Sequence, residues 1–218
     1  MKKAAVLIVD DHPIVRQGLK MLINQAEDLE VKGEAEDMRG ALSAMEALRP
    51  DIVIIDISLK GANGIELLEA MQERFPSIPA LVLSMHEEWL YAQRALQAGA
   101  RGYVMKQEAI EHVVMALHRV LRGEVYVSDK IADRLLHFVV AGGKRESASL
   151  MDQLTNRELQ TFQMIGKGFT TREIANQLNL SVKTIESYRE NIKRKLNLQN
   201  SNELVRYAIY RAQDISST

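Results

Sequence analysis

The first 124 residues alternate between short apolar runs and stretches in which apolar residues recur at helical spacing. The runs are almost continuous in Val, Ile, Leu and Ala, which is typical of strands buried on both faces of a parallel sheet. Val31–Ala35 is a weaker and more polar run, as expected of an edge strand. The four stronger runs are Ala4–Val9, Asp51–Ile55, Ala80–Leu83 and Gly102–Met105.

A helical pattern follows each of the five runs. In the first of these patterns Val15, Leu19 and Ile23 recur on one helix face, and Pro50 and Pro76 mark later boundaries. Five strand–helix units in series predict an α/β fold with a doubly wound, five-stranded parallel sheet.

Residues 150–218 show helical patterns and no convincing strand. Thr155 and Glu158 form a capping box at the start of one helix, and Ser181 can cap another. A helix, a short turn and a second helix form the motif that presents its second helix to the major groove of DNA. We therefore predict a small all-α helix-turn-helix domain of four helices over 156–166, 171–178, 182 to about 196 and 201–212.

The segment between the two halves has a different character. Asp129–Val140 is predicted as a helix with Ser128 as a possible cap, and 142–149 is small and polar, so it should be flexible. The sequence leaves open whether this helix dimerises or packs on the first domain. The predicted organisation is a domain over 1–124, a linker with a helix over 125–149 and a second domain over 150–218.

Composition supports two folded modules with different partners. The 218 residues are 46% hydrophobic and 26% charged, which suits one or two globular domains. The net charge of −1 is divided unevenly, because residues 1–124 carry 14 basic and 19 acidic side chains whereas residues 150–218 carry 10 and 7. The basic second half permits nucleic-acid binding without requiring it.

Composition also excludes several classes of function. The absence of cysteine rules out disulfides, thiolate metal sites and cysteine catalysis, and is compatible with the reducing cytoplasm, where we expect the protein. No apolar stretch approaches the roughly 18 residues of a membrane span. The amino terminus does not have the pattern of a secretory signal, so no membrane partner is expected.

Polar side chains stand where the predicted strands end. Asp10 and Asp11 follow the first strand. Asp56 ends the third, Ser84 the fourth and Lys106 the fifth. The carboxyl ends of parallel strands form the binding edge of such a sheet, so these residues are expected to meet. Clustered carboxylates need a cation, and Mg²⁺ suits them because it prefers oxygen ligands. Asp56 can then attack a phosphoryl group whose charge Lys106 helps to neutralise.

On these residues the first half resembles the receiver domain of bacterial two-component response regulators, which has a flavodoxin-like fold. The matching strings are VLIVDDHPIVRQGL, DIVIIDISLKGANGIEL, LVLSMH and GARGYVMK, over about residues 4–122. The resemblance implies that a sensor histidine kinase phosphorylates Asp56. It also implies Mg²⁺ binding by Asp11, Asp56 and the main-chain carbonyl of Ser58. Asp10 assists in this binding.

The resemblance also bears on residues around the phosphoacceptor. It implies that Ser84 is the switch hydroxyl, Lys106 the phosphate partner and Tyr103 the aromatic residue whose rotamer follows Ser84. An acyl phosphate would change charge and hydrogen bonding near Ser84, which suits a switch. His12 is expected to begin a helix before Pro13 rather than to bind metal or act as a base.

Several positions depart from the family pattern. Lys60 and Asn63 stand where the loop after the acceptor usually carries a proline and often an aspartate. Met85 follows the switch serine where a small residue is common, and Ser58 and His86 occupy places that tune autodephosphorylation in this family. We favour Lys60 pointing to solvent and His86 being a surface residue. The phosphate lifetime stays open.

The third predicted helix of the second half has two distinct faces. Residues 181–195 hold five basic and two acidic side chains, which suits phosphate contacts at the edges of a face and base contacts at its centre. Spacing at 100° per residue separates an apolar from a polar side. The apolar side comprises Val182, Ile185, Ile192 and Leu196, and the polar side Lys183, Ser187, Glu190 and Arg194.

About residues 154–209 resemble the LuxR-type helix-turn-helix, on the string LTNRELQTFQMIGKGFTTREIANQLNLSVKTIESYRENIKRKLNLQNSNELVRYAI. Together the two resemblances indicate the NarL/FixJ subfamily of response regulators. The implied DNA phosphate contacts are Lys183, Thr184, Arg189, Lys193 and Lys195. The implied base-reading residues are Glu186, Ser187 and Glu190. The implied dimerisation residues are Asn202, Val205, Arg206 and Tyr207. A glutamate can accept a hydrogen bond from cytosine N4, and it repels phosphates.

The combined interpretation is a transcription regulator switched by phosphorylation, not an enzyme with a turnover substrate. Phosphorylation of Asp56 is expected to shift the population toward a homodimer. The two third helices of that dimer would contact half-sites about one helical turn apart on double-stranded promoter DNA. The kinase, the operator and the sign of regulation stay open.

Three alternatives remain open from the sequence. A phosphatase with an aspartyl-phosphate intermediate shares the Asp, Mg²⁺ and Lys chemistry, but Ser58 stands where its second carboxylate is expected. A regulator with a vestigial receiver would bind its promoter equally well with and without a phosphodonor. A pure interaction scaffold gives no reason for the capped helix-turn-helix.

Overall fold

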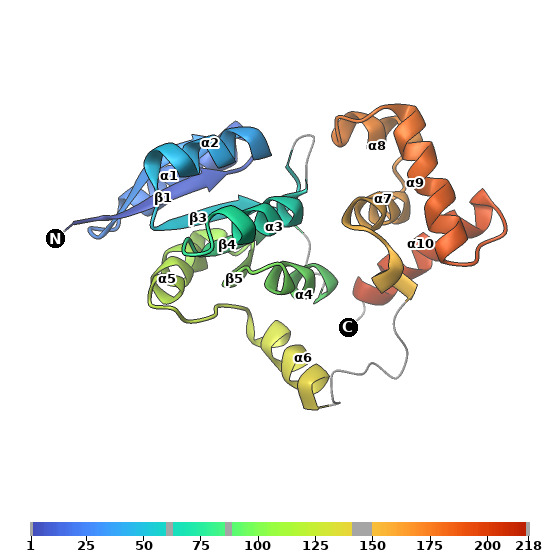
Figure 1. Ribbon diagram of the computed structural model, residues 1–218. Helices are drawn as coiled ribbons and strands as arrows, with labels where there is room; N and C mark the ends of the chain where they lie inside the picture. The colour runs from blue at the N-terminus through green and yellow to red at the C-terminus, as the bar shows by residue number, and fades with distance from the viewer. Residues whose placement is uncertain (1, 60–62, 86–88, 141–149, 217–218) are drawn as a thin grey trace. The chain divides into compact units, whose positions relative to one another are not determined.

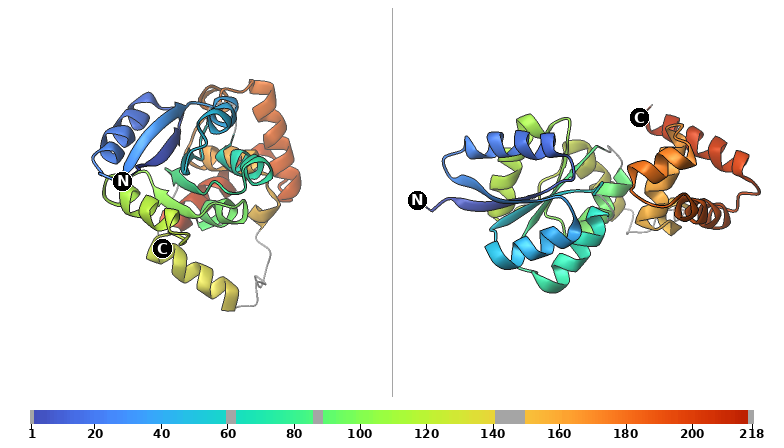
Figure 2. Two further views of the ribbon diagram at one scale, coloured as in Figure 1. Left: turned by 60° about the vertical axis from the view of Figure 1, so that its left-hand side comes forward. Right: turned by 90° about the horizontal axis from the view of Figure 1, so that it is seen from above.

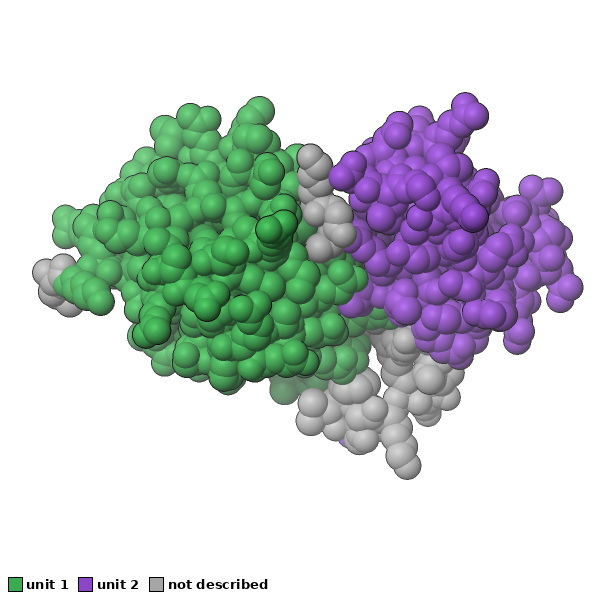
Figure 3. Space-filling model, turned by 45° about the horizontal axis from the view of Figure 1, so that its top comes forward, with its two compact units in different colours: residues 1–137 green, residues 138–218 purple. Residues whose placement is uncertain are grey.

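The computed structural model describes most of the chain, namely residues 2–59, 63–85, 89–140 and 150–216. They divide into two compact units, Met1–His137 and Phe138–Thr218, which Figure 3 shows in different colours. Lys60, His86 and the predicted flexible stretch 142–149 lie outside the described residues.

Five strands form the sheet of the first unit (Figure 1), namely β1 (Ala4–Val9), β2 (Leu29–Ala35), β3 (Ile52–Asp56), β4 (Ala80–Ser84) and β5 (Gly102–Met105). Their order is β2-β1-β3-β4-β5, and all neighbouring pairs are parallel. The predicted five-stranded parallel sheet is thus confirmed. The polar run forms the edge strand β2, and the continuous apolar runs of β1, β3 and β4 fill the centre.

Five helices cover the sheet, namely α1 (Pro13–Asn24), α2 (Met38–Leu48), α3 (Gly64–Arg74), α4 (Trp89–Gln97) and α5 (Ala109–Leu121). The helices α1 and α5 pack on one face, and α2, α3 and α4 on the other (Figure 2). Ile8 and Ile54 of the sheet are buried in one cluster with Leu19 of α1 and Leu117 of α5. Each such side chain contributes about 1.5–3 kcal/mol by leaving water.

The segment after α5 packs with the first unit. The Tyr103 amide donates to the Tyr126 carbonyl at 2.8 Å, and the Tyr126 amide donates to the Arg101 carbonyl at 3.0 Å. These bonds cover part of the otherwise open edge of β5. The helix α6 (Asp129–Val140) follows, and Ser128 Oγ accepts from the Ile131 amide at 3.4 Å, as expected of its cap. The first compact unit therefore extends beyond residue 124.

The second unit consists of a short 3₁₀ turn η1 (Leu150–Gln153) and the helices α7 (Asn156–Gly166), α8 (Thr171–Gln177), α9 (Val182–Lys195) and α10 (Ser201–Ser216). The four predicted helices are confirmed, and α10 runs longer than predicted. Asn179 takes a left-handed conformation in the turn between α8 and α9, at φ 53°. Across the described residues, no helix has the length and apolarity that a membrane crossing requires.

Capping and packing explain where these helices begin. Ser181 Oγ accepts from the Thr184 amide at 3.0 Å, so the predicted cap of α9 is present. Ile185 and Ile192 are buried as predicted, whereas Val182 is 39% exposed. Val182 is exposed because it is the first residue of the helix and lies at the margin of the apolar stripe, 60° from Ile185 at about 100° per residue.

A partly buried ion pair joins α7 to α9. One carboxylate oxygen of Glu158, Oε2, accepts from the Thr155 amide at 2.8 Å and from Lys195 Nζ at 2.6 Å. Burial alone would raise the pKa of Glu158, but the bonds from Lys195 and Thr155 outweigh it and the pKa is lowered. The capping box of α7 is therefore also a charged contact between two helices.

The substitution Glu158→Gln removes this charge and keeps a side chain that capping boxes accept. A lowered folded pKa means that the ion pair stabilises the fold above the ordinary Glu pKa of about 4.3. This stabilisation is lost as the pH falls through the folded pKa. We expect the variant to lose about 1–3 kcal/mol of unfolding free energy in the second unit at pH 7. The difference should close as the pH falls below about 4, as measured by amide hydrogen exchange in α7 and α9.

Glu173→Gln is the matched control, because Glu173 holds the same position in the capping box of α8. Its carboxylate accepts only from Thr170 among the described residues. We expect a smaller loss for this variant. Equal losses for the two variants at pH 7 would show that Lys195 adds nothing.

Candidate functional site

Three charged side chains meet at the carboxyl edge of the sheet. Lys106, which follows β5, places its Nζ 2.6 Å from Asp10 Oδ2 and 2.7 Å from Asp56 Oδ2. Their side chains are only 8%, 2% and 1% exposed, in that order. The parallel register brings these strand ends together, as the sequence predicts.

The other oxygen of each carboxylate is held by the main chain. Asp10 Oδ1 accepts from the His12 amide at 2.8 Å, and Asp56 Oδ1 accepts from the Ser58 amide at 3.2 Å. Arg16 of α1 donates from Nη1 to the main-chain carbonyl of Asp10 at 2.6 Å. Both carboxylates are thus fixed in orientation before any ligand arrives.

Burial and charge act in opposite directions on these groups. Burial raises the pKa of the Asp56 carboxyl, the charge of Asp10 raises it further, and Lys106 opposes both. Burial acts to lower the pKa of Lys106, but the charges of Asp56 and Asp10 outweigh it and raise the pKa. Lys106 therefore stays protonated and supplies a permanent positive charge to the site.

Four residues at this edge have the donor atoms of a metal site. Asp10, Asp11, His12 and Asp56 each offer one ligand atom, and these atoms lie within 4.8 Å of one another. Carboxylate oxygens predominate, so the set suits a hard cation such as Mg²⁺. His12 both begins α1 and lies at the cluster, with Nδ1 2.7 Å from Asp11 Oδ1. The first of these positions agrees with the prediction from the sequence, whereas the second was not expected.

The two predicted switch residues lie on neighbouring strands. Ser84, at the end of β4, and Tyr103, in β5, are both fully buried. Ser84 pairs in register with Met105. Tyr103 precedes Met105 by two residues, so both lie on the same face of the sheet and Tyr103 is further from its carboxyl edge. Met85, next to the switch serine, is 56% exposed, so its side chain lies largely in solvent.

Gly64 supports the site in a way that sequence reasoning missed. Its amide donates to the Ile57 carbonyl at 2.8 Å, which folds the start of α3 against the end of β3. A methyl group at this position would overlap the main-chain carbonyl of Asp56 and lie 2.9 Å from Ile57 Cα. Asn63 Oδ1 accepts from the Ile65 amide and caps the same helix. The glycine and asparagine in the string GANG were the available signal.

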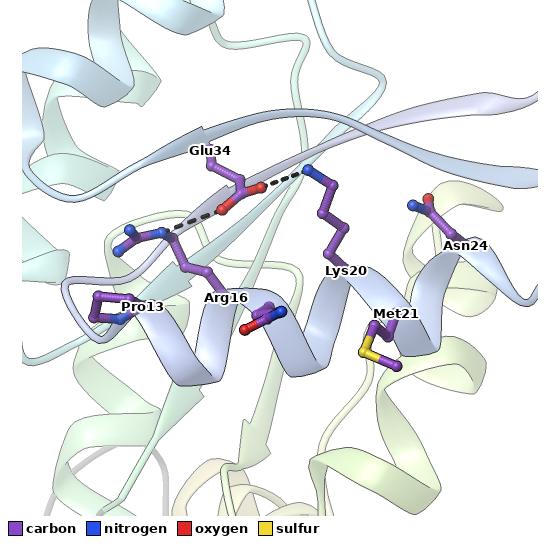
Figure 4. Close-up of a pocket in the computed structure, with 7 residues that line it drawn as sticks. Pro13, Arg16, Lys20, Met21, Asn24 and Glu34 are labelled. Carbon is purple, nitrogen blue, oxygen red and sulfur yellow. Dashed lines mark hydrogen bonds and ion pairs between the residues drawn. The ribbon is translucent and has the colours of Figure 1, made fainter.

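A surface hollow lies beside α1 (Figure 4). Its wall includes Met21 and Asn24 of α1 and Glu34 of β2. Lys20 and Arg16 both reach Glu34, at 2.8 Å and 3.3 Å. Both cations that line this hollow are therefore paired with the same carboxylate, and these partly exposed pairs leave only one net positive charge, which is a weak basis for binding a charged ligand.

The second unit carries the predicted DNA-binding residues on α9. Two of the predicted phosphate contacts form ion pairs within the unit, Lys193 with Glu190 at 2.8 Å and Lys195 with Glu158 at 2.6 Å. The exposed residues of this prediction are Lys183, Glu186, Ser187 and Glu190, and the half-buried ones are Thr184, Arg189, Lys193 and Lys195.

The predicted dimerisation residues lie on α10. Asn202 and Arg206 are exposed, and Val205 and Tyr207 are half-buried. The Tyr207 ring packs 5.9 Å from the Phe162 ring of α7, so part of its surface already stabilises the unit. An exposed side of α10 is nevertheless available for a partner.

Comparison with known proteins gives a match for each unit. The family described as response regulator receiver domain matches residues 6–118, and that described as bacterial regulatory proteins, luxR family, matches residues 152–208. Oxygen regulatory protein NreC of Staphylococcus epidermidis is 36% identical over 209 residues, which cover 94% of this chain and 96% of that protein. The Staphylococcus aureus protein of the same name is 34% identical over 208 residues, with the same coverage.

Solved structures with a similar fold include the RcsB response regulator of Salmonella typhimurium. One RcsB structure has a TM-score of 0.67 at 30% identity and covers 96% of this chain and 98% of that chain. Another holds RcsB bound to promoter rprA in the presence of the phosphomimetic BeF₃⁻, with a TM-score of 0.62 at 30% identity and coverage of 95% and 98%. The similarity spans both units.

The contact between Gly64 and the Asp56 main chain generates a stability prediction. We expect Gly64→Ala to lower the unfolding free energy of the first unit by about 1–3 kcal/mol, because the added methyl group displaces β3 or α3. Denaturant unfolding can be followed by the fluorescence of Trp89, the sole tryptophan, which lies in α4 of this unit.

Gly18→Ala is the control, because an added methyl group at Gly18 of α1 meets nothing within 4 Å. It should raise stability by about 0.5–1 kcal/mol through helix propensity. If the Gly64 variant is as stable as the Gly18 variant, the close approach at Asp56 is not a constraint.

Proposed function

The chain belongs to the NarL/FixJ-type response regulators, which join a receiver domain to a LuxR-type DNA-binding domain, and on this basis we propose that phosphorylation of Asp56 controls its binding to promoter DNA. The observation that carries the proposal is the buried contact of Lys106 with Asp10 and Asp56 at the carboxyl edge of the sheet. Each predicted domain has its own proposed role. Residues 1–124 form the receiver, 125–149 the linker and 150–218 the DNA-binding domain.

Asp56 is the proposed phosphoacceptor. A carboxylate oxygen of Asp56 attacks phosphorus in the phosphohistidine of a sensor kinase, the P–N bond breaks, and the histidine takes up a proton. Lys106, already 2.7 Å from Asp56 Oδ2, stabilises negative charge on the transferred group. The contact from the Ser58 amide keeps the carboxylate oriented during the attack.

Mg²⁺ fits the proposed site through Asp10, Asp11, Asp56 and the main-chain carbonyl of Ser58. When bound, it would neutralise charge on the phosphoryl oxygens. His12 lies beside this set and can hold the Asp11 carboxylate through Nδ1. Asp10 already shares its second oxygen with Lys106, which suits an assisting role.

Ser84 and Tyr103 are the proposed switch. A phosphoryl group on Asp56 adds hydrogen-bond acceptors near the Ser84 hydroxyl, which lies at the end of the adjacent strand. Movement of Ser84 would change the surroundings of the Tyr103 ring, which is buried in the present state, and so favour a different rotamer of that ring. A difference of a few kcal/mol between two such arrangements is enough to shift the population.

The DNA-binding domain is proposed to act as a dimer on double-stranded promoter DNA. Lys183, Thr184 and Arg189 are the proposed phosphate contacts that hold α9 in the major groove. Lys193 and Lys195 stay on the proposed list, although their ammonium groups already pair with glutamates. The proposed contacts between two such domains are Asn202, Val205, Arg206 and Tyr207 of α10.

The family is one of transcription regulators, so the chain is not an enzyme in the usual sense. Hydrolysis of its own acyl phosphate is the one turnover that we propose, and Ser58 and His86 stand at the positions that tune this rate in the family. The remaining alternative is a regulator whose DNA binding ignores phosphorylation. The complete set of Asp10, Asp11, Asp56, Ser84 and Lys106 argues against that alternative.

The test compares the purified full chain with Asp56→Asn in magnesium-containing buffer, before and after treatment with a small phosphodonor. We expect the wild type to gain a phosphoryl group that alkali or hydroxylamine removes, as from an acyl phosphate, and to bind promoter fragments at least several-fold more tightly. Asp56→Asn should do neither. Mass spectrometry and genome-wide footprinting give the two readouts.

Asp51→Asn is the matched control, because Asp51 precedes β3 and accepts from the Ala5 amide, away from the site. We expect this variant to be phosphorylated by the phosphodonor and to bind promoter fragments as the wild type does. Labelling that persists in Asp56→Asn would refute the acceptor. Equal promoter affinity with and without the phosphodonor would favour the phosphorylation-independent alternative.

A further inference from the structure

Three side chains of α9 are candidates for contact with base edges, namely Glu186, Ser187 and Glu190. All three are exposed, so burial does not distinguish them. Their contacts within the unit do distinguish them, because a side chain that already has a hydrogen-bond or ion-pair partner has less need of a partner from DNA. The inference rests on the proposed function and concerns which of the three determines the operator sequence.

Ser187 and Glu190 already have partners. The Ser187 hydroxyl donates to the Lys183 carbonyl at 3.0 Å, which turns it back along the helix. Glu190 Oε1 lies 2.8 Å from Lys193 Nζ, one helical turn away. While Lys193 keeps this contact, the Glu190 carboxylate has a donor of its own and less need of one from a base.

Glu186 is in a different position. Among the described residues its carboxylate has no hydrogen bond and no ion pair. Lys183 and Arg189 lie three residues to either side, on the same part of the helix surface, and their side chains are likewise without ion pairs in the described part of the chain. These cations can hold phosphates on both sides while Glu186 projects between them.

An unpaired carboxylate that loses water at an interface is costly unless it finds a hydrogen-bond donor. Phosphate oxygens are acceptors and repel it. In the major groove, the donors are the amino groups N4 of cytosine and N6 of adenine. Adenine also presents the acceptor N7 beside its amino group, which opposes the second carboxylate oxygen. Cytosine therefore satisfies Glu186 best.

We propose that Glu186 is the specificity-determining residue of this regulator and that it accepts a hydrogen bond from N4 of a cytosine in each half-site. The unpaired carboxylate penalises every sequence without a donor at that place, so it acts by exclusion as well as by attraction. Replacement of the cytosine by thymine, whose O4 is an acceptor, should lower affinity roughly tenfold.

The experiment selects binding sites from a random duplex library with the phosphodonor-treated full chain. It compares the wild type, Glu186→Gln and Glu190→Gln. The two variants remove the same charge from the same helix face, so their general affinity for DNA should rise alike. The carboxylate that Glu190→Gln removes has an ion-pair partner within the unit, and the one that Glu186→Gln removes does not.

We expect the wild type and Glu190→Gln to select the same cytosine in each half-site. Glu186→Gln should lose that preference or shift it toward adenine, since a glutamine amide can bond to adenine N6 and N7 together. The inference is overturned if Glu186→Gln keeps the cytosine or if only Glu190→Gln loses it. If the wild type selects no sequence at all, the proposed function fails, and the inference fails with it.

Discussion

One buried ammonium group shared by two buried carboxylates is the constraint on which the receiver depends. Lys106 reaches from the end of β5 to Asp10 and Asp56, although β4 lies between β5 and β3. One positive charge does not balance two negative ones, and Asp11 adds a third nearby. The site is therefore held together by an ion pair and still has an excess of negative charge, which favours the binding of a cation.

Such a cluster adds little net stability to the fold, and its main role is to form the site. Removing three charges from water costs several kcal/mol per ion, and mutual attraction offsets this only when the geometry is good. Here the main-chain amides of His12 and Ser58 satisfy the remaining oxygens. The apolar packing of the central strands supplies the stability that permits the site to remain charged and buried.

The sequence predicted the fold and the location of the site because both follow from periodicity. Continuous apolar runs define buried parallel strands, and the polar residue that ends each strand must lie at the carboxyl edge. Contacts that depend on side-chain rotamers could not be predicted from the sequence. The contact of His12 with Asp11 and the close approach of Gly64 to Asp56 depend on the path of the chain through a turn. The ion pair of Lys195 with Glu158 depends on how α9 packs against α7.

The same limit applies to the DNA-binding unit, where counting charges gives a misleading impression of its surface. Five basic residues between 181 and 195 suggest a uniformly cationic helix. Lys195 instead connects α9 to α7 through Glu158, and Lys193 neutralises Glu190. Among the described residues, Glu186 is the acidic residue of this helix without such a partner, and it is the one proposed to distinguish one DNA sequence from another.

The most direct test of the central claim is the stability of Lys106→Gln in denaturant, followed by Trp89 fluorescence with and without Mg²⁺. Two buried carboxylates without their cation should cost the first unit about 3–5 kcal/mol, and Mg²⁺ should restore part of this loss. Lys20→Gln, which breaks only the exposed pair with Glu34, should cost less than about 1 kcal/mol. A Lys106→Gln protein that unfolds at the same denaturant concentration as the wild type, and whose stability does not change with Mg²⁺, would contradict the account.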